Sequence, residues 1–165
     1  MGVCTRLRDL NDVAAELGTS QPTAVIYCNN CVRACGSGGE PQMARISQTL
    51  RELGVRLEEE VMATNPCCRG FLEEYRPAGA VRTVLMVACE PAAFALQTLR
   101  PDLRLVVALD TLGLFINSKA KGRLKLAMAF PGFEHLQGKE FKLGDVTTMY
   151  DDELLPAPRA TEVPR

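Results

Sequence analysis

Short apolar runs alternate along the first two thirds of the chain with segments whose apolar residues recur every three or four positions. The runs predict buried strands at residues 23–27, 55–62, 82–88 and 103–109. The helical spacing predicts helices at residues 5–17, 40–53 and 90–99, and a proline stands in the opening turn of the last two.

This order of strands and helices predicts an α/β fold, because a strand, a crossover helix and a further strand form a right-handed parallel unit. We therefore expect a doubly wound, mainly parallel four-stranded sheet, with cysteine-bearing loops at the carboxyl ends of its strands. Residues 1–150 are expected to form a single α/β metal-cluster domain, in which residues 113–128 fit either a helix or an added strand and residues 141–149 fit another edge strand. Residues 151–165 contain acidic residues and three prolines, and we expect them to be a mobile tail.

The composition allows a hydrophobic core but gives no electrostatic reason to expect nucleic acid or a membrane as a partner. Hydrophobic residues make up 47% of the chain, and the formal net charge is −1 with a pI of about 5.9. Residues 1–10 lack the apolar segment of a secretory signal, and no run approaches the roughly 20 apolar residues that span a bilayer. The expected location is the cytoplasm.

Seven cysteines dominate the candidate chemistry, because clustered thiols in a reducing compartment bind metals or carry out redox reactions more often than they form disulfides. Cys4 is interpreted as a small buried core residue. The other six follow the predicted strand ends, and ligands of open parallel sheets bind beyond the carboxyl ends of the strands. We therefore predict one cofactor site lined by Cys28, Cys31, Cys35, Cys67, Cys68 and Cys89.

The loop after the first predicted strand carries a Cys-x-x-Cys-x-x-x-Cys run, from Cys28 through Cys31 to Cys35. Three thiolates from one loop and a fourth from a distant loop complete the four-cysteine set of a [4Fe–4S] cluster. Four thiolates also satisfy a tetrahedral zinc site, so zinc is the alternative metal. A thioredoxin-type pair would use Cys28 and Cys31 alone and would leave the remaining thiols unexplained.

Few other residues indicate chemistry. His135 is the only histidine and is expected in a surface loop. The sequence has neither a GxGxxG nor a Walker motif, so nucleotide binding by a glycine-rich loop has no support. Because no acid, base or nucleophile accompanies the thiols, we expect a non-catalytic subunit of an oxidoreductase complex rather than an enzyme that acts alone.

Residues 25–54, VIYCNNCVRACGSGGEPQMARISQTLRELG, resemble the cysteine-rich small subunit of acetogen-type methylenetetrahydrofolate reductase, a domain that also forms the C-terminus of related reductases. The shared features are a strand that runs into the three-cysteine segment, a Gly-Gly-Glu turn and a helix that ends at Leu-x-x-x-Gly. A lone loop cysteine (here Cys67 or Cys68), the pair Ala88–Cys89 and a Leu-x-Thr-Leu element follow in the same order. The resemblance covers about residues 22–115.

The resemblance implies an iron–sulfur protein that docks on a flavin-containing reductase subunit, or on another redox protein, and transfers electrons in one-carbon metabolism. It implies cluster-site ligands among Cys28, Cys31, Cys35, Cys67 and Cys89. The family continues into a second cysteine-rich segment, whereas this chain has no cysteine after Cys89. We therefore expect a single cluster, and the role of residues 113–150 is left open.

Three alternatives remain at this stage. The order of Cys35, the Cys67–Cys68 pair and Cys89 is similar to the CCG-type cluster domain of heterodisulfide reductases, although the closing Cys-x-x-Cys is missing. A redox-silent zinc module that presents a protein-binding surface would use the same thiols. In the third alternative, the chain is a component of an enzyme, and the cluster or metal keeps one coordination position open for a thiol or a methyl group.

Overall fold

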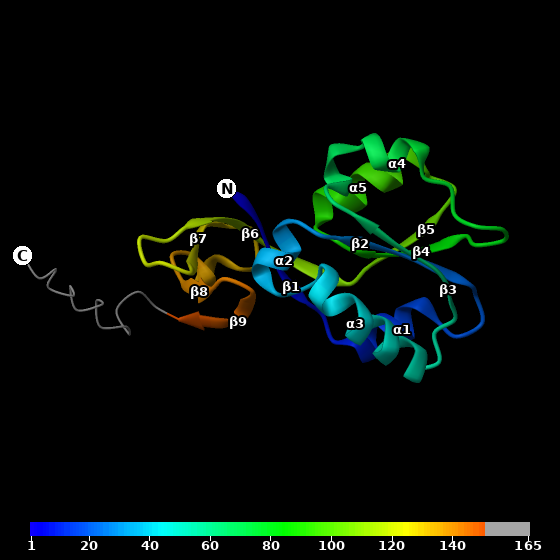
Figure 1. Cartoon of the computed structure of the whole chain (residues 1–165), viewed down its shortest axis with the longest axis horizontal. Helices are drawn as coiled ribbons and strands as arrows, with labels where there is room; N and C mark the ends of the chain where they lie inside the picture. The colour runs from blue at the N-terminus through cyan, green and yellow to red at the C-terminus, as the bar shows by residue number, and fades with distance from the viewer. Residues whose placement is uncertain (151–165) are drawn as a thin grey trace, which may run out of the picture.

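The computed structural model describes residues 1–150, which form one parallel and one antiparallel sheet (Figure 1). The parallel sheet has the strand order β3-β2-β4-β5. Its strands are β2 (Thr23–Cys28), β3 (Leu57–Ala63), β4 (Thr83–Val87) and β5 (Arg104–Val107). Each overlaps one of the predicted apolar runs, and β3 tolerates its run of glutamates because it lies at the edge of the sheet.

Helices cover both faces of the parallel sheet, with α1 and α3 on one side and α4 and α5 on the other (Figure 1). These helices are α1 (Leu10–Leu17), α3 (Glu40–Glu52), α4 (Gly70–Glu74) and α5 (Glu90–Leu99). Two shorter elements carry cysteines, the helix α2 (Cys31–Cys35) and the 3-10 turn η1 (Pro66–Cys68). None of the helices within residues 1–150 is long and apolar enough to cross a lipid bilayer.

The other strands form a curled antiparallel sheet with the order β1-β6-β7-β8-β9. They are β1 (Gly2–Leu7), β6 (Leu109–Asn117), β7 (Arg123–Ala129), β8 (Glu140–Lys142) and β9 (Asp145–Tyr150), and the 3-10 turn η2 (Glu134–Leu136) lies between β7 and β8. Although β1 and β9 stand at opposite ends of this order, their backbones lie close together. The sheet therefore wraps around a core of its own.

The prediction of a doubly wound, mainly parallel α/β domain is wrong, because five strands form this separate antiparallel sheet. Of these strands, β6 and β7 cover most of residues 113–128, which fitted either a helix or an added strand, and β8 and β9 overlap the edge strand expected at residues 141–149. The first strand, β1, was not expected at all, since its last residues belong to the segment predicted as a helix from residue 5. The helix α1 begins only at Leu10, where the Asp9 carboxylate accepts a hydrogen bond from the Asn11 N–H at 2.8 Å.

The two sheets meet at Ala108, which lies between β5 and β6. Its N–H donates to the Met86 carbonyl of β4 at 2.9 Å, and its own carbonyl accepts from the Arg8 N–H at 3.0 Å. The chain thus passes from the parallel sheet into the antiparallel one without an intervening loop. Close to this junction, Thr111 Oγ1 accepts a hydrogen bond from the Glu90 N–H at 3.0 Å, which fixes the first turn of α5 against β6.

Each sheet has its own hydrophobic core, and the cysteines are divided between them. The larger core fills the space between the parallel sheet and its helices and includes Cys28 and Cys89. The smaller core lies inside the antiparallel sheet and includes Cys4, Cys35 and Phe141. The predicted tail, residues 151–165, lies outside the described residues.

Candidate metal-thiolate site

Four cysteines from three different loops become neighbours at the carboxyl ends of the parallel strands. Cys28 is the last residue of β2 and Cys31 the first of α2, Cys67 lies in η1, and Cys89 precedes α5. Each of the four sulfurs interacts electrostatically with at least two of the others. We call Cys28, Cys31, Cys67 and Cys89 the thiol site.

Burial and the neighbouring thiols make the charged form of Cys28 unfavourable. Loss of water raises the pKa of this thiol to about 11, and the nearby sulfurs of Cys31 and Cys67 add to the rise. The residue is 4% exposed, and its S–H donates to the Thr64 carbonyl at 3.7 Å. In the metal-free chain this group is therefore a neutral thiol at physiological pH.

The same causes act on the two thiols contributed by the other loops. Burial, and then the nearby sulfurs of Cys28 and Cys31, raise the pKa of Cys89 to about 11. Although Cys67 is exposed as a residue, partial burial of its sulfur and the nearby thiols of Cys89, Cys68 and Cys31 raise its pKa to about 11 as well. A cation bound among these sulfurs would favour their thiolate forms and so oppose both burial and the mutual repulsion.

Backbone N–H groups oppose this repulsion at two of the sulfurs. The N–H groups of Asn30 and Val32 point at the Cys28 sulfur, and that of Ala92 points at the Cys89 sulfur, and in each case the hydrogen bond favours the thiolate. Hydrogen bonds to ligand atoms orient metal-binding side chains and adjust the properties of the metal. The local backbone is thus arranged to support thiolates at both positions.

Two polar contacts hold the loops of the thiol site together. The Asn29 N–H donates to the Ala63 carbonyl at 2.9 Å and so extends the pairing of β2 with β3 by one residue. Beyond it, the side-chain amide of Asn30 donates to the side-chain carbonyl of Asn65. The Cys28 loop and the Cys67 loop are therefore joined directly, before any metal is considered.

Cys68 lies beside the thiol site on its exposed side. Its thiol hydrogen-bonds to Cys67, and the residue is exposed. The next residue, Arg69, has a φ of 65°, and among residues 1–150 it is the one non-glycine with positive φ. A strained backbone next to two adjacent cysteines is typical of functional loops, where the surrounding structure imposes the conformation.

Cys35 is placed differently from the other cysteines of its loop. It ends α2 and is fully buried in the smaller core. Its S–H donates to the Val3 carbonyl at 3.7 Å, and its sulfur interacts with the neighbouring Cys4 thiol. The contacts that the structure gives this thiol are therefore with β1, and the expectation that it joins the cofactor site stays a prediction.

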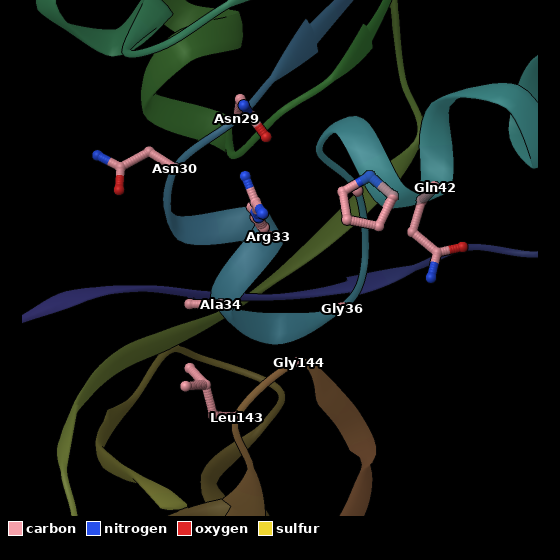
Figure 2. Close-up of a pocket in the computed structure, with 10 residues that line it drawn as sticks. Asn29, Asn30, Arg33, Ala34, Gly36, Gln42, Leu143 and Gly144 are labelled. Atoms are coloured by element: carbon pink, nitrogen blue, oxygen red, sulfur yellow. The ribbon is translucent and has the colours of Figure 1, made fainter. Parts of the chain in front are cut away.

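A cavity of about 480 Å³ adjoins the loop that carries Cys28 and Cys31. Its walls come from α2 and the two residues before it, from the start of α3, and from the turn between β8 and β9 (Figure 2). The lining residues are Asn29, Asn30, Arg33, Ala34, Gly36, Gly38, Pro41, Gln42, Leu143 and Gly144. A small molecule or a partner side chain in this cavity would sit beside the thiol site.

The turn between β8 and β9 presses closely on α2. The Gly144 N–H donates to the Ala34 carbonyl at 2.7 Å. Gly36, with a φ of 69°, lies so close that an added Cβ would stand 1.9 Å from the Gly144 carbonyl oxygen. The antiparallel sheet therefore holds α2 from two sides, through β1 and through this turn.

Sequence reasoning identified the cysteines but missed the residues that position them. Asn30 and Asn65 were available as a signal, because each is an amide within two residues of a cysteine in a predicted loop. Leu143 and Gly144 lie far from the cysteines in the sequence, and only the tertiary fold brings them to α2. Within residues 1–150, no three His, Cys, Asp or Glu side chains stand in an arrangement that could hold a metal ion, so the thiol site is a set of neighbours rather than a formed coordination sphere.

Comparison of the chain with protein-family models, with curated proteins and with solved structures gave no match.

Proposed function

We propose that the thiol site binds one [4Fe–4S] cluster and that the chain is an electron-transfer or assembly subunit of a flavin-containing oxidoreductase. The observation that carries this proposal is the convergence of Cys28, Cys31, Cys67 and Cys89 from three loops, with backbone N–H groups pointing at two of the sulfurs. A cluster of this kind is held by four cysteine thiolates.

The donor set matches such a cluster in number and in chemistry, although within residues 1–150 no three of these side chains stand in a metal-binding arrangement. All four donors are sulfur, which is the soft ligand that iron–sulfur clusters and zinc select. Two of them, Cys28 and Cys89, are 4% exposed and lie at the ends of buried strands, so the ligands are held by the core of the protein. When bound, the cluster would supply one-electron transfer, and the chain's own residues would set its environment through burial and N–H···S hydrogen bonds.

Two features support a role as a subunit rather than as an enzyme acting alone. The thiol site reaches the surface through Cys67 and Cys68, which are exposed, so a partner's redox group would find a short path to it. On α5, which begins immediately after Cys89, Phe94 is 75% exposed. Aromatic residues are enriched among those that carry the binding energy of protein interfaces.

The resemblance of residues 22–115 to the small subunit of acetogen-type methylenetetrahydrofolate reductase indicates the class of partner. On that basis the partner would be a flavin-containing reductase of one-carbon metabolism. A CCG-like cluster subunit is the less favoured hypothesis. The contact between Cys68 and Cys67 agrees with the paired cysteines of that family, but the closing Cys-x-x-Cys of the family is missing from this chain.

The decisive experiment measures iron, zinc and acid-labile sulfide in the full chain after strictly anaerobic purification. The proposal predicts about four iron and four sulfide per chain, with a broad absorption near 400 nm that bleaches with dithionite. One zinc per chain with a featureless spectrum would replace it with a structural or thiol-activating zinc protein. A cluster that dithionite fails to reduce would leave the metal assignment intact and contradict the electron-transfer role.

A further inference from the structure

The cavity beside α2 has an unequal set of hydrogen-bonding groups, and this imbalance indicates what it can bind. Its volume is about 480 Å³, which lies in the range of pockets that enclose small organic molecules. Taken over residues 1–150, its lining includes none of the cysteines of the thiol site. Figure 2 shows Arg33 near the middle of the view, with Asn29 above it, Gln42 to its right and Leu143 below it.

Two side-chain amides in the walls have their oxygen occupied and their NH2 group unused. Asn29 Oδ1 accepts a hydrogen bond from the Glu40 N–H at 3.0 Å, and Gln42 Oε1 accepts one from Arg45 Nε at 2.9 Å. Among residues 1–150, the structure gives neither Asn29 Nδ2 nor Gln42 Nε2 an acceptor. Since each amide nitrogen carries two N–H groups, both side chains have donors to offer a ligand.

The guanidinium of Arg33 adds a positive charge to these donors. Its ion-pair partner, Glu40, lies 3.8 Å from Nη1, which is beyond hydrogen-bond distance, and the two side chains are 54% and 73% exposed. An exposed ion pair of this kind contributes little. A ligand oxyanion that hydrogen-bonds to Arg33 would therefore displace Glu40 from it.

The unused side-chain groups in the walls are mostly donors. The Asn30 amide is the exception, because its NH2 group already donates to the side chain of Asn65. An arginine carries five N–H donors and no acceptor. A ligand that is rich in acceptor oxygens and negatively charged therefore matches the cavity better than a neutral or cationic one.

The backbone of α3 is not the source of these donors, although the helix begins beside the cavity. The Glu40 N–H donates to Asn29 Oδ1, and Pro41 has no N–H group. The Gln42 N–H donates to the Gly39 carbonyl at 3.1 Å. Recognition of a ligand would therefore depend on the side chains.

We propose that this cavity binds a small organic molecule through an oxyanion, either a carboxylate or a phosphate ester. The Arg33 guanidinium is its principal partner, because the planar fork of N–H groups matches two oxygens of such an anion. The NH2 groups of Asn29 and Gln42 supply further donors. The apolar part of the ligand lies against Ala34 and Leu143. Such a ligand binds beside the thiol site without replacing any of its cysteines.

Isothermal titration of the full chain with phenyl phosphate, benzoate and benzamide tests the proposal. The first two carry the alternative oxyanions on the same ring, whereas benzamide is neutral and similar in shape to benzoate. We expect at least one anion to bind about tenfold more tightly than benzamide, and the tighter anion identifies a phosphate ester or a carboxylate as the ligand group. Benzamide that binds as tightly as both anions would overturn the proposal, as would no binding of either anion up to about 10 mM.

Three variants establish that the anion binds in this cavity. Arg33→Gln removes the charge from an exposed side chain and should weaken binding of the tighter anion by at least about tenfold. Glu40→Gln removes the competing carboxylate and should tighten binding about twofold. Arg56→Gln is the matched control, because this guanidinium pairs with Glu58 at the start of β3, at the opposite end of the parallel strands from the thiol site. Its affinity should stay within about twofold of wild type. Equal affinities of the Arg33 and Arg56 variants would mean that the anion binds elsewhere, which would overturn the proposal.

Discussion

The side-chain amide of Asn30 donates a hydrogen bond to the side-chain carbonyl of Asn65, across 35 positions of sequence. The contact joins the loop of Cys28 and Cys31 to the loop of Cys67 without the help of a metal. Since both asparagines are exposed, the contact adds little to overall stability. Its effect is to limit how far the two cysteine loops separate.

Replacement of Asn65 should therefore weaken metal binding more than it weakens the fold. We expect Asn65→Ala to lower metal affinity by about tenfold, in the range seen when a residue supporting a metal ligand is lost. The free energy of unfolding of the metal-free chain should fall by no more than about 1 kcal/mol. Asn65→Asp is the matched control, because its carboxylate still accepts from Asn30. Competition with a chromogenic chelator gives the affinity, and equal affinities for the two variants would refute this role.

Serine substitutions should separate the ligands from the neighbouring cysteines. We expect Cys28→Ser, Cys31→Ser, Cys67→Ser and Cys89→Ser each to lower the bound metal per chain to less than about half of wild type, since a hydroxyl is a poor ligand for soft metals. Cys68→Ser should retain the metal, because the structure gives its thiol a contact with Cys67 alone among the thiol site. Metal analysis after anaerobic purification measures both sets. If Cys67 and Cys68 behave alike, both adjacent thiols contribute.

The individual strands of the parallel sheet were predictable because each is a local apolar run with its own boundary signals. Residues 23–27, for example, are fully buried in β2, and their apolar, β-branched run predicts a strand from the sequence alone. The antiparallel sheet was not predictable in this way. In its first strand, β1, the consecutive residues Cys4 and Thr5 are both buried, so the strand lacks the alternation that would mark a half-buried strand.

The convergence of the cysteines was predictable where it depends only on the ends of adjacent parallel strands. Cys28 and Cys89 follow adjacent parallel strands, β2 and β4, so their convergence follows from topology alone. Cys35 shows the limit of spacing arguments. It shares a short segment with Cys28 and Cys31, but α2 packs on β1 and places Cys35 in the smaller core. The strand β1 in turn pairs with β6, which follows the whole parallel sheet in the sequence.

Alkaline pH should destabilise the metal-free chain. The pKa values of Cys28 and Cys89 are raised from an ordinary 9.0 to about 11, so the unfolded chain loses these protons at lower pH than the folded chain does. The stabilisation is complete below pH 9.0 and is lost as the pH rises toward 11. A shift of this size corresponds to at most about 2–3 kcal/mol per thiol.

Urea unfolding of the metal-free chain at about pH 8 and pH 10.5 measures this loss. The midpoint should fall in wild type and should fall less in Cys89→Ser, which lacks one of the titrating thiols. The variant is needed as a comparison because burial also raises the pKa of Tyr27 to about 12, and this group acts in the same direction. Equal losses in the two chains would show that the thiols do not titrate as described.

Gly36→Ala should disturb the contact between α2 and the turn that joins β8 to β9. The new methyl group would stand 1.9 Å from the Gly144 carbonyl oxygen, and the φ of 69° is unfavourable for alanine. We expect a loss of about 2–4 kcal/mol of unfolding free energy. Gly138→Ala is the matched control, since its φ is 84° but nothing lies within 4 Å of an added Cβ. That variant should lose only about 1–2 kcal/mol, and chemical unfolding compares the two.

Phe141→Ala should show how strongly the smaller core supports the fold. Phe141 is 0% exposed and meets the ring of Phe115 edge-on, with centroids 6.2 Å apart. Its loss should cost about 3–5 kcal/mol. Phe94→Ala removes the same side chain from an exposed position and should change stability by less than about 0.5 kcal/mol. A thermal melt of both variants is sufficient, and similar melting temperatures would contradict the packing described for the antiparallel sheet.

The pairing of β1 with β6 also constrains the order of events during synthesis. The first strand of the chain leaves the ribosome early, but its hydrogen-bonding partner, residues 109–117, follows only after all four strands of the parallel sheet. Long-range pairing of this kind is slow and leaves an edge strand uncovered in the meantime. The parallel sheet, with the loops of all four thiols of the thiol site, therefore has the opportunity to fold first. The antiparallel sheet then closes over α2 as the last step, so a cofactor delivered to the nascent chain would meet its ligands before the N-terminal strand is in place.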